Sequence, residues 1–150
     1  MQISKDLLKG VDRDAVLTQI RTAKSAHMRW RAYAQAIISG VDIEENKVPV
    51  KHTDCTFGKW YYGEGWKILG HLDAYQAIAT PHKVLHAIYE RIYQTIHKEE
   101  KKGFSRLWSK DSTQTRKGQA LEHLDELIGT SETLLRMLDL LEQEIRKVKL

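Results

Sequence analysis

Residues 12–39, DRDAVLTQIRTAKSAHMRWRAYAQAIIS, decide the fold class. Their apolar side chains recur at alternating intervals of four and three residues, which is the spacing of one helical face. The members of this face are Val16, Ile20, Ala23, Trp30, Ala34 and Ile37, and His27 fills the one remaining place. Asp12 suits an N-cap and Gly40 suits a stop after the last turn. The sequence therefore predicts a long helix that turns one histidine toward the core.

Two later segments show the same periodicity. One predicted helix begins at Pro81, with Thr80 as its cap, because proline is tolerated in a first turn. Its inner face carries His82, Leu85, His86, Tyr89, Tyr93 and Ile96. The closing helix is predicted over about 112–148, with Ser112 or Arg116 as its start. Its stripe consists of Leu121, Leu124, Ile128, Ser131, Leu134 or Leu135, Leu138, Leu141 and Ile145.

Shorter helices are expected between the long ones. Cys55 would open a short helix that Asp54 or Thr53 caps and that Gly63 and Gly65 end. Another short helix is predicted over 72–79, whereas 98–118 is a basic connection with a helical patch at Phe104, Leu107 and Trp108. Strand signals are weak throughout. We therefore expect an all-α, antiparallel four-helix bundle, with an additional short helix carrying Cys55, in a single domain over 1–150.

The composition excludes several classes of protein. Hydrophobic residues make up 41% of the 150 and charged residues 29%, which is typical of a globular domain rather than a disordered chain. The net charge of +4 is not gathered into the dense basic stripe of a nucleic-acid binder. No window approaches the roughly 18 apolar residues of a membrane span. Because the single cysteine fits a reducing compartment and the first residues do not resemble a signal peptide, we expect a cytoplasmic location.

The strongest chemical signal is the sequence His82-Lys-Val-Leu-His86. Residues four apart lie one above the other on a helix, so two imidazoles can share one metal ion. Such a pair also arises by chance, and a lone core histidine such as His27 ordinarily hydrogen-bonds a neighbour or a backbone carbonyl. Here, however, two helices turn histidines inward, and the only cysteine, Cys55, lies between them.

Three imidazoles and one thiolate suit tetrahedral zinc. The predicted ligands are His27, Cys55, His82 and His86. Nitrogen and sulfur donors argue against magnesium or calcium, and the lack of a carboxylate on the His82 and His86 face argues against a di-iron centre. His52 is an alternative ligand, whereas His71, His97 and His123 are expected at the surface or bundle edge.

Aromatic residues accompany the predicted ligands. Trp30 lies one turn from His27, and Phe57 and Trp60 follow Cys55. Each also suits ordinary core packing, and the two roles are compatible because residues around a metal site pack like a core. We expect Trp30 and Trp60 to shield the ion from water, with Phe57 packed beside them.

The three motifs together resemble a known family. His27-Met-Arg-Trp30, Cys55-Thr-Phe-Gly-Lys-Trp-Tyr-Tyr-Gly-Glu-Gly65 and Pro81-His82-Lys-Val-Leu-His86 are similar to the CZB family, the chemoreceptor zinc-binding domain. The resemblance covers about 13–100 and extends to the last helix as the closing member. It implies a four-helix bundle, often dimeric, in which zinc is held by His27, Cys55, His82 and His86. Family members usually sit beside a chemoreceptor signalling region or a diguanylate cyclase, for which 150 residues leave no room.

Four functions can be considered for such a site. The leading hypothesis is a regulatory sensor in bacterial signalling or chemotaxis that responds to zinc or to oxidation of Cys55. The alternative is a helical interaction module with a purely structural zinc ion, since four protein ligands close the coordination sphere. A metalloenzyme would need an open position and a general base, so we expect no catalysis. A hemerythrin-like oxygen carrier would need further histidines and core carboxylates.

The closing helix also suggests a partner. Over about 35 residues it would exceed the first helix by roughly 12 Å. The stripe of Leu134, Leu138, Leu141, Ile145 and Val148 would continue through this overhang, where a second copy of the chain is the simplest cover. We therefore expect a homodimer, with a signalling module either as a separate protein or in a longer parent chain. The bland alternative is that the stripe packs on residues 104–108 of its own chain.

Overall fold

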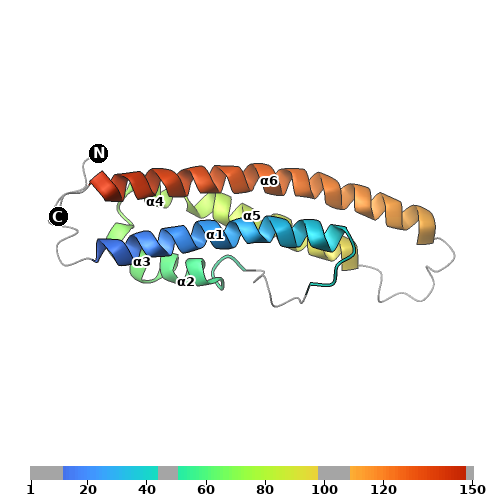
Figure 1. The fold of residues 1–150 in the computed structure, drawn as a ribbon, viewed down its shortest axis with the longest axis horizontal. Coiled ribbons are helices and arrows are strands. Elements are labelled where there is room, and N and C mark those ends of the chain that lie inside the picture. Colours follow the sequence, from blue (N-terminus) through green and yellow to red (C-terminus); the bar gives the residue numbers. More distant parts are fainter. Residues whose placement is uncertain (1–11, 44–50, 98–108, 148–150) are drawn as a thin grey trace.

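A computed structural model describes residues 12–43, 51–97 and 109–147, and all regular structure in these ranges is helical. Three long helices lie side by side: α1 (Arg13–Ile38), α5 (Ala79–His97) and α6 (Ser109–Lys147). The short helices α2 (Thr56–Tyr62) and α3 (Glu64–Leu69) run along the outside of α1, and α4 (Asp73–Gln76) leads into α5 (Figure 1). The all-α prediction is confirmed. None of the described helices is long and apolar enough to cross a membrane.

Helix α1 follows its predicted pattern closely. The Asp12 side chain accepts a hydrogen bond from the Ala15 N–H at 3.2 Å, which satisfies one of the otherwise unpaired donors of the first turn. The helix ends at Ile38 with Ser39 as its C-cap, and Gly40 follows with a φ of 92°. All seven residues of the predicted face are buried, His27 among them.

Helix α5 begins earlier than predicted. Thr80 is its second residue and not its cap, because the amide of His82 already donates to the Ile78 carbonyl at 3.1 Å. Pro81 stands in the first turn, where no N–H donor is needed. Both histidines nonetheless face the core as expected, since they share one helical face with the buried Leu85 and Tyr89.

Helix α6 also begins earlier, at Ser109, and its buried stripe differs from the prediction in its first half. Leu127 is fully buried, whereas Leu121 is 45% exposed and Ile128 is only partly buried. The true stripe keeps intervals of four and three throughout: Ala120, Leu124, Leu127, Ser131, Leu134, Leu138, Leu141 and Ile145. At two places the prediction therefore chose the neighbour of the buried residue, Leu121 instead of Ala120 and Ile128 instead of Leu127.

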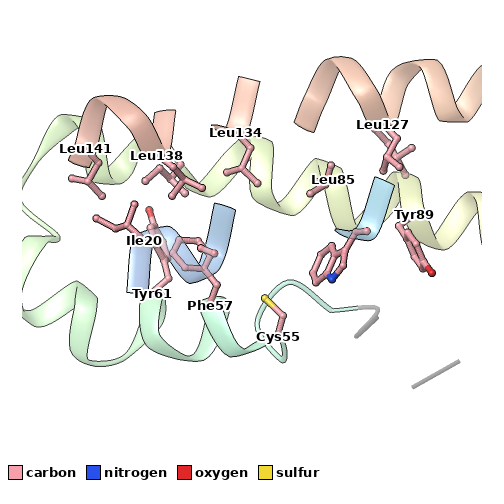
Figure 2. Packing of buried hydrophobic residues seen from close by; sticks show 14 of the residues in the cluster. Ile20, Cys55, Phe57, Tyr61, Leu85, Tyr89, Leu127, Leu134, Leu138 and Leu141 are labelled. Atoms are coloured by element: carbon pink, nitrogen blue, oxygen red, sulfur yellow. The ribbon is translucent and has the colours of Figure 1, made fainter. Parts of the chain in front are cut away.

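The same stripe contradicts the argument that an uncovered apolar end of the last helix calls for a dimer. Leu134, Leu138, Leu141 and Ile145 are buried within one chain, so they leave no apolar surface for a second copy to cover. Figure 2 shows the three leucines packed above Ile20 and the aromatic residues of α2. Helix α6 instead extends past α1 and α5 at its N-terminal end (Figure 1). Val148 and the 104–108 patch lie outside the described residues.

A buried carboxylate fixes α1 against α6. Glu142, 8% exposed, accepts hydrogen bonds from Arg21 at 3.1 Å and from Arg146 at 2.7 Å, and Lys24 binds both Glu142 and Asp139. The Lys24 hydrogen bond is the main reason that the pKa of Glu142 falls to about 2. Because these partners come from two antiparallel helices, the cluster sets their relative position along the bundle axis.

A pair of tyrosines holds the short helices together. Tyr61, near the end of α2, donates its hydroxyl proton to the Tyr75 carbonyl at 2.7 Å, and the Tyr75 hydroxyl donates to the Tyr61 carbonyl in return. Their rings stack with centroids 4.3 Å apart and are nearly parallel. Helix α2 ends at Gly63 as predicted, but Gly65 lies inside α3, a helix that the sequence did not indicate.

Candidate metal centre

Four buried side chains from three parts of the fold converge between α1, α5 and the start of α2. His27 comes from α1, His82 and His86 come from α5, and Cys55 immediately precedes α2. One potential ligand atom from each lies within 4.8 Å of the other three. Each residue is at most 4% exposed. The structure therefore brings together the four residues that the sequence singled out.

The separation of sulfur and nitrogen fits a zinc-sized ion. The Cys55 Sγ lies 3.4 Å from the His82 Nε2. Zn–N bonds of about 2.0 Å and Zn–S bonds of about 2.3 Å at a tetrahedral angle place these two atoms roughly 3.5 Å apart. The potential ligand atoms lie up to 4.8 Å from one another, which is somewhat more than the separation of ligand atoms around a bound zinc ion. Small side-chain shifts would bring the remaining donors onto an ion.

The orientation of His27 also favours a metal ligand. Its Nδ1 lies 2.6 Å from the Ala23 carbonyl one turn earlier, so the proton of the neutral ring belongs on Nδ1. The Nε2 then presents a lone pair to the interior, where it is fully buried and has no hydrogen-bond partner among the residues that the structure describes. A buried acceptor without a partner is unfavourable unless a ligand such as a cation satisfies it.

Burial keeps the histidines neutral. It lowers the pKa of His27 to about 4, against a smaller opposite effect of the Ala23 carbonyl. Burial also lowers the pKa of His82 well below its usual range, and His27, His86 and His52 lower it further by charge repulsion. Neutral imidazole is the form that binds a metal ion, so no proton has to leave these two rings at neutral pH.

Cys55 itself caps α2. Its backbone is extended, and its Sγ accepts a hydrogen bond from the Gly58 N–H at 3.2 Å. The expectation that Asp54 or Thr53 caps this helix was wrong, because the helix begins at Thr56. Burial raises the pKa of the Cys55 thiol, and the Gly58 N–H acts in the opposite direction. A cation at this point would convert the thiol to thiolate, so metal binding releases a proton.

Gly58 is required for this cap. A Cβ at this position would come within 1.8 Å of the His52 carbonyl oxygen, so any side chain displaces the loop that carries Cys55. We expect Gly58→Ala to weaken zinc binding at least about tenfold, the effect typical of a lost supporting contact. A competition titration with a zinc-binding dye measures the change.

The matched control is Gly129→Ala in α6. A Cβ there meets nothing within 4 Å, so zinc affinity should stay unchanged while the helix gains about 0.5–1 kcal/mol. Equal zinc affinity in Gly58→Ala and the wild type would show that the cap does not position Cys55.

Aromatic rings enclose the centre on two sides. The Trp30 ring lies 4.5 Å from that of His27 and 4.4 Å from that of His86, between centroids. The Phe57 ring lies 5.2 Å from that of His82. Trp60 does not join Trp30 as expected. One turn further along α2, its ring faces Phe57 and Tyr75 instead, at 6.0 and 6.1 Å.

The other histidines lie outside the cluster. The His52 ring is 6.0 Å from that of His82, but His52 is partly exposed and contributes no atom to the group of four. His71 is exposed, and His97 and His123 are half-buried beside Tyr93 and Glu126. Within the described residues no carboxylate belongs to the group, which agrees with the argument against a di-iron centre.

Sequence reasoning missed two supporting groups, the Ala23 carbonyl and the Gly58 N–H. The i−4 position of Ala23 relative to His27 was available as a signal, because it is the carbonyl that a helical histidine reaches most easily. Cysteine is not among the usual N-cap residues, so the role of Cys55 had no comparable signal.

Comparison with known proteins agrees with this geometry. No curated protein and no solved structure matches the chain. One family model does match, that of the chemoreceptor zinc-binding domain, and the matched segment starts at His27 and contains all four clustered residues. Zinc is accordingly the cofactor that both the family and the donor set indicate. Over residues 27–93 the chain is thus similar to the chemoreceptor zinc-binding domain (CZB) family.

Proposed function

We propose that His27, Cys55, His82 and His86 hold one zinc ion and that the domain is a regulatory sensor whose state depends on this ion and on the oxidation state of Cys55. The observation that carries the proposal is the unequal support of the ligands. Three of them stand on the long helices α1 and α5, whereas Cys55 stands on a loop ahead of the seven-residue α2. Loss of the Cys55 bond would therefore free one short segment and leave the long helices in place.

Zinc ties this segment to the bundle. The Cys55 thiolate would connect the start of α2 to two helices at once, in addition to the apolar contacts of Phe57 and Tyr61. Small helices of this length are not stable alone, so their order depends on such contacts. A change in zinc occupancy would in this way become a change in the structure around Cys55.

Oxidation would act on the same bond. The zinc-bound thiolate remains nucleophilic, and its sulfur can attack one oxygen of hydrogen peroxide. The O–O bond then breaks, one oxygen stays on sulfur as sulfenic acid, and the other leaves as hydroxide and takes up a proton. Sulfenic acid is a poor zinc ligand, so the ion is released, and a thiol reductant would restore the site.

The test follows zinc release with a zinc-binding dye after peroxide is added to the zinc-loaded protein. We expect release from the wild type and rebinding after reduction. The matched variant is Cys55→His, which offers a nitrogen donor that peroxide does not oxidise and should keep its zinc. If both proteins release zinc at the same rate, Cys55 is not the trigger.

The competing function is a purely structural zinc site, which the closed set of four protein donors favours. In that case peroxide would leave both the zinc content and the mass of Cys55 unchanged over hours. We propose no catalytic role, because four protein donors leave no position for a reacting water. The output partner in our proposal is a signalling module, as a separate protein or in a longer parent chain.

We also propose a homodimer, which would form on a face of α6 other than its buried stripe. Leu121, Ile128 and Leu135 recur every seven residues on the flank of α6 and stay partly exposed. Such a stripe suits a second helix. Light scattering at micromolar concentration should give twice the chain mass of 17.4 kDa, and Leu121→Glu should reduce it. A mass of one chain in the wild type would exclude the dimer.

A further inference from the structure

A cavity of about 290 Å³ opens beside α1 and reaches the metal centre. His27 and Cys55 line it, together with the aromatic side chains of Trp30 and Phe57. His82 and His86 do not line it, although they complete the group of four. The cavity therefore reaches the centre on the side of His27 and Cys55.

The outer part of the cavity has a small and a charged residue. Ala26, on α1, lies in the wall and is only partly buried, so a larger side chain at this position would extend into the space. Arg29, one turn later, is exposed at the same cavity and brings a positive charge to it. Thr56, which also lines the cavity, is uncharged.

We propose that this cavity is the route by which small oxidants and electrophiles reach Cys55, with Ala26 setting the size limit and Arg29 favouring anionic reagents. The inference rests on the proposed function, because it describes how the cysteine of that site is reached. Cys55 is only 4% exposed, so a reagent needs either such a route or an opening of the whole segment. The two routes differ in how the rate of Cys55 modification depends on the size of the reagent and on the residues of the cavity wall.

Local opening is the competing route. When α2 detaches from α1, Cys55 meets solvent directly, and the rate of modification depends on the free energy of opening. A change in the cavity wall would then have little effect, and reagents of different size would react with similar preference. Passage through the cavity instead requires that the reagent fit within its walls, to which Trp30 and Phe57 contribute.

The experiment alkylates the zinc-loaded protein with iodoacetamide and follows both the mass of the protein and the release of zinc to a dye. In this reaction the Cys55 sulfur forms a bond to carbon, the carbon–iodine bond breaks, and iodide leaves. We expect Ala26→Leu to slow alkylation at least about tenfold, because only reaction through local opening remains. The matched control is Ala32→Leu, on the same helix, exposed and not part of the cavity.

A second comparison tests the charge. Iodoacetate and iodoacetamide are of similar size but differ in charge. The alkylation rate with iodoacetate divided by that with iodoacetamide therefore isolates the electrostatic contribution. Arg29→Gln should lower this ratio about threefold or more, and the effect should shrink at high salt. An unchanged ratio would remove Arg29 from the proposal.

The outcomes separate this inference from the proposed function. Each variant is first titrated with zinc, and only variants with wild-type zinc content are compared. If Ala26→Leu loses zinc, Thr22→Leu, at another exposed position of the cavity, takes its place. Normal zinc binding with equal alkylation rates in wild type, cavity variant and control would overturn the access route alone. Absence of zinc from the wild type would overturn the proposed function itself.

Discussion

Replacement of His82 by alanine is expected to reduce the zinc content from one ion per chain to almost none. His82 is 1% exposed, and its Nε2 lies beside the Cys55 sulfur, so its loss removes a donor from the middle of the group. Lost supporting contacts alone weaken metal sites by about 10- to 100-fold, and removal of a ligand should exceed that range. Elemental analysis after dialysis, together with a dye competition titration, measures both content and affinity.

The control for this variant is His52→Ala. His52 is the nearest histidine outside the group, with its ring 6.0 Å from that of His82, and it was the alternative ligand. Its replacement should leave the zinc content unchanged, as should that of the exposed His71. Equal zinc loss in the His52 and His82 variants, or iron at two atoms per chain, would disprove the site.

Removal of zinc by a chelator is expected to lower the free energy of unfolding by about 4 kcal/mol when the free ion had been about a thousandfold above its dissociation constant. For a chain of 150 residues this corresponds to a fall in melting temperature of roughly 8–16 °C. The effect arises because the ion binds only the folded arrangement of four distant residues. Thermal unfolding with and without chelator measures it, and Cys55→Ala should respond far less.

Hydrogen exchange should locate the same effect. Without zinc, the amides from Thr53 to Trp60 should lose protection first, because the start of α2 then keeps few contacts besides Phe57. The amides of α1 and α6 should stay protected by their shared apolar core and by Glu142. Uniform exchange in both states would contradict a local change at Cys55.

Much of the fold and of the site was predictable from periodicity. The series of four and three residues placed His27, His82 and His86 on buried faces, because a helix has few ways to bury an apolar stripe. The single cysteine between them completed a set of three nitrogen donors and one sulfur donor, which is typical of zinc. These inferences depend on regular spacing within long helices, which tertiary contacts seldom override.

The errors fall where local signals compete. Thr80 is a good cap residue, but the chain was already helical before it, so the tertiary course of α4 into α5 decided the start. Leu121 and Leu127 are equally apolar, and only the packing of α6 against two helices selects between them. Trp60 belongs to a helix of seven residues, too short for its faces to be assigned by spacing.

The reciprocal tyrosine pair limits how far a freed Cys55 can travel. Tyr61 and Tyr75 exchange these hydrogen bonds with each other and not with the four clustered side chains, so we expect them to persist when zinc is lost. They would then act as a fixed hinge, about which the chain ahead of Tyr61 could swing. Helix α2 has seven residues and is about 10 Å long, which bounds the arc at its free end. Under the proposed sensor function, a partner that detects the zinc-free state would therefore contact this domain beside the start of α2.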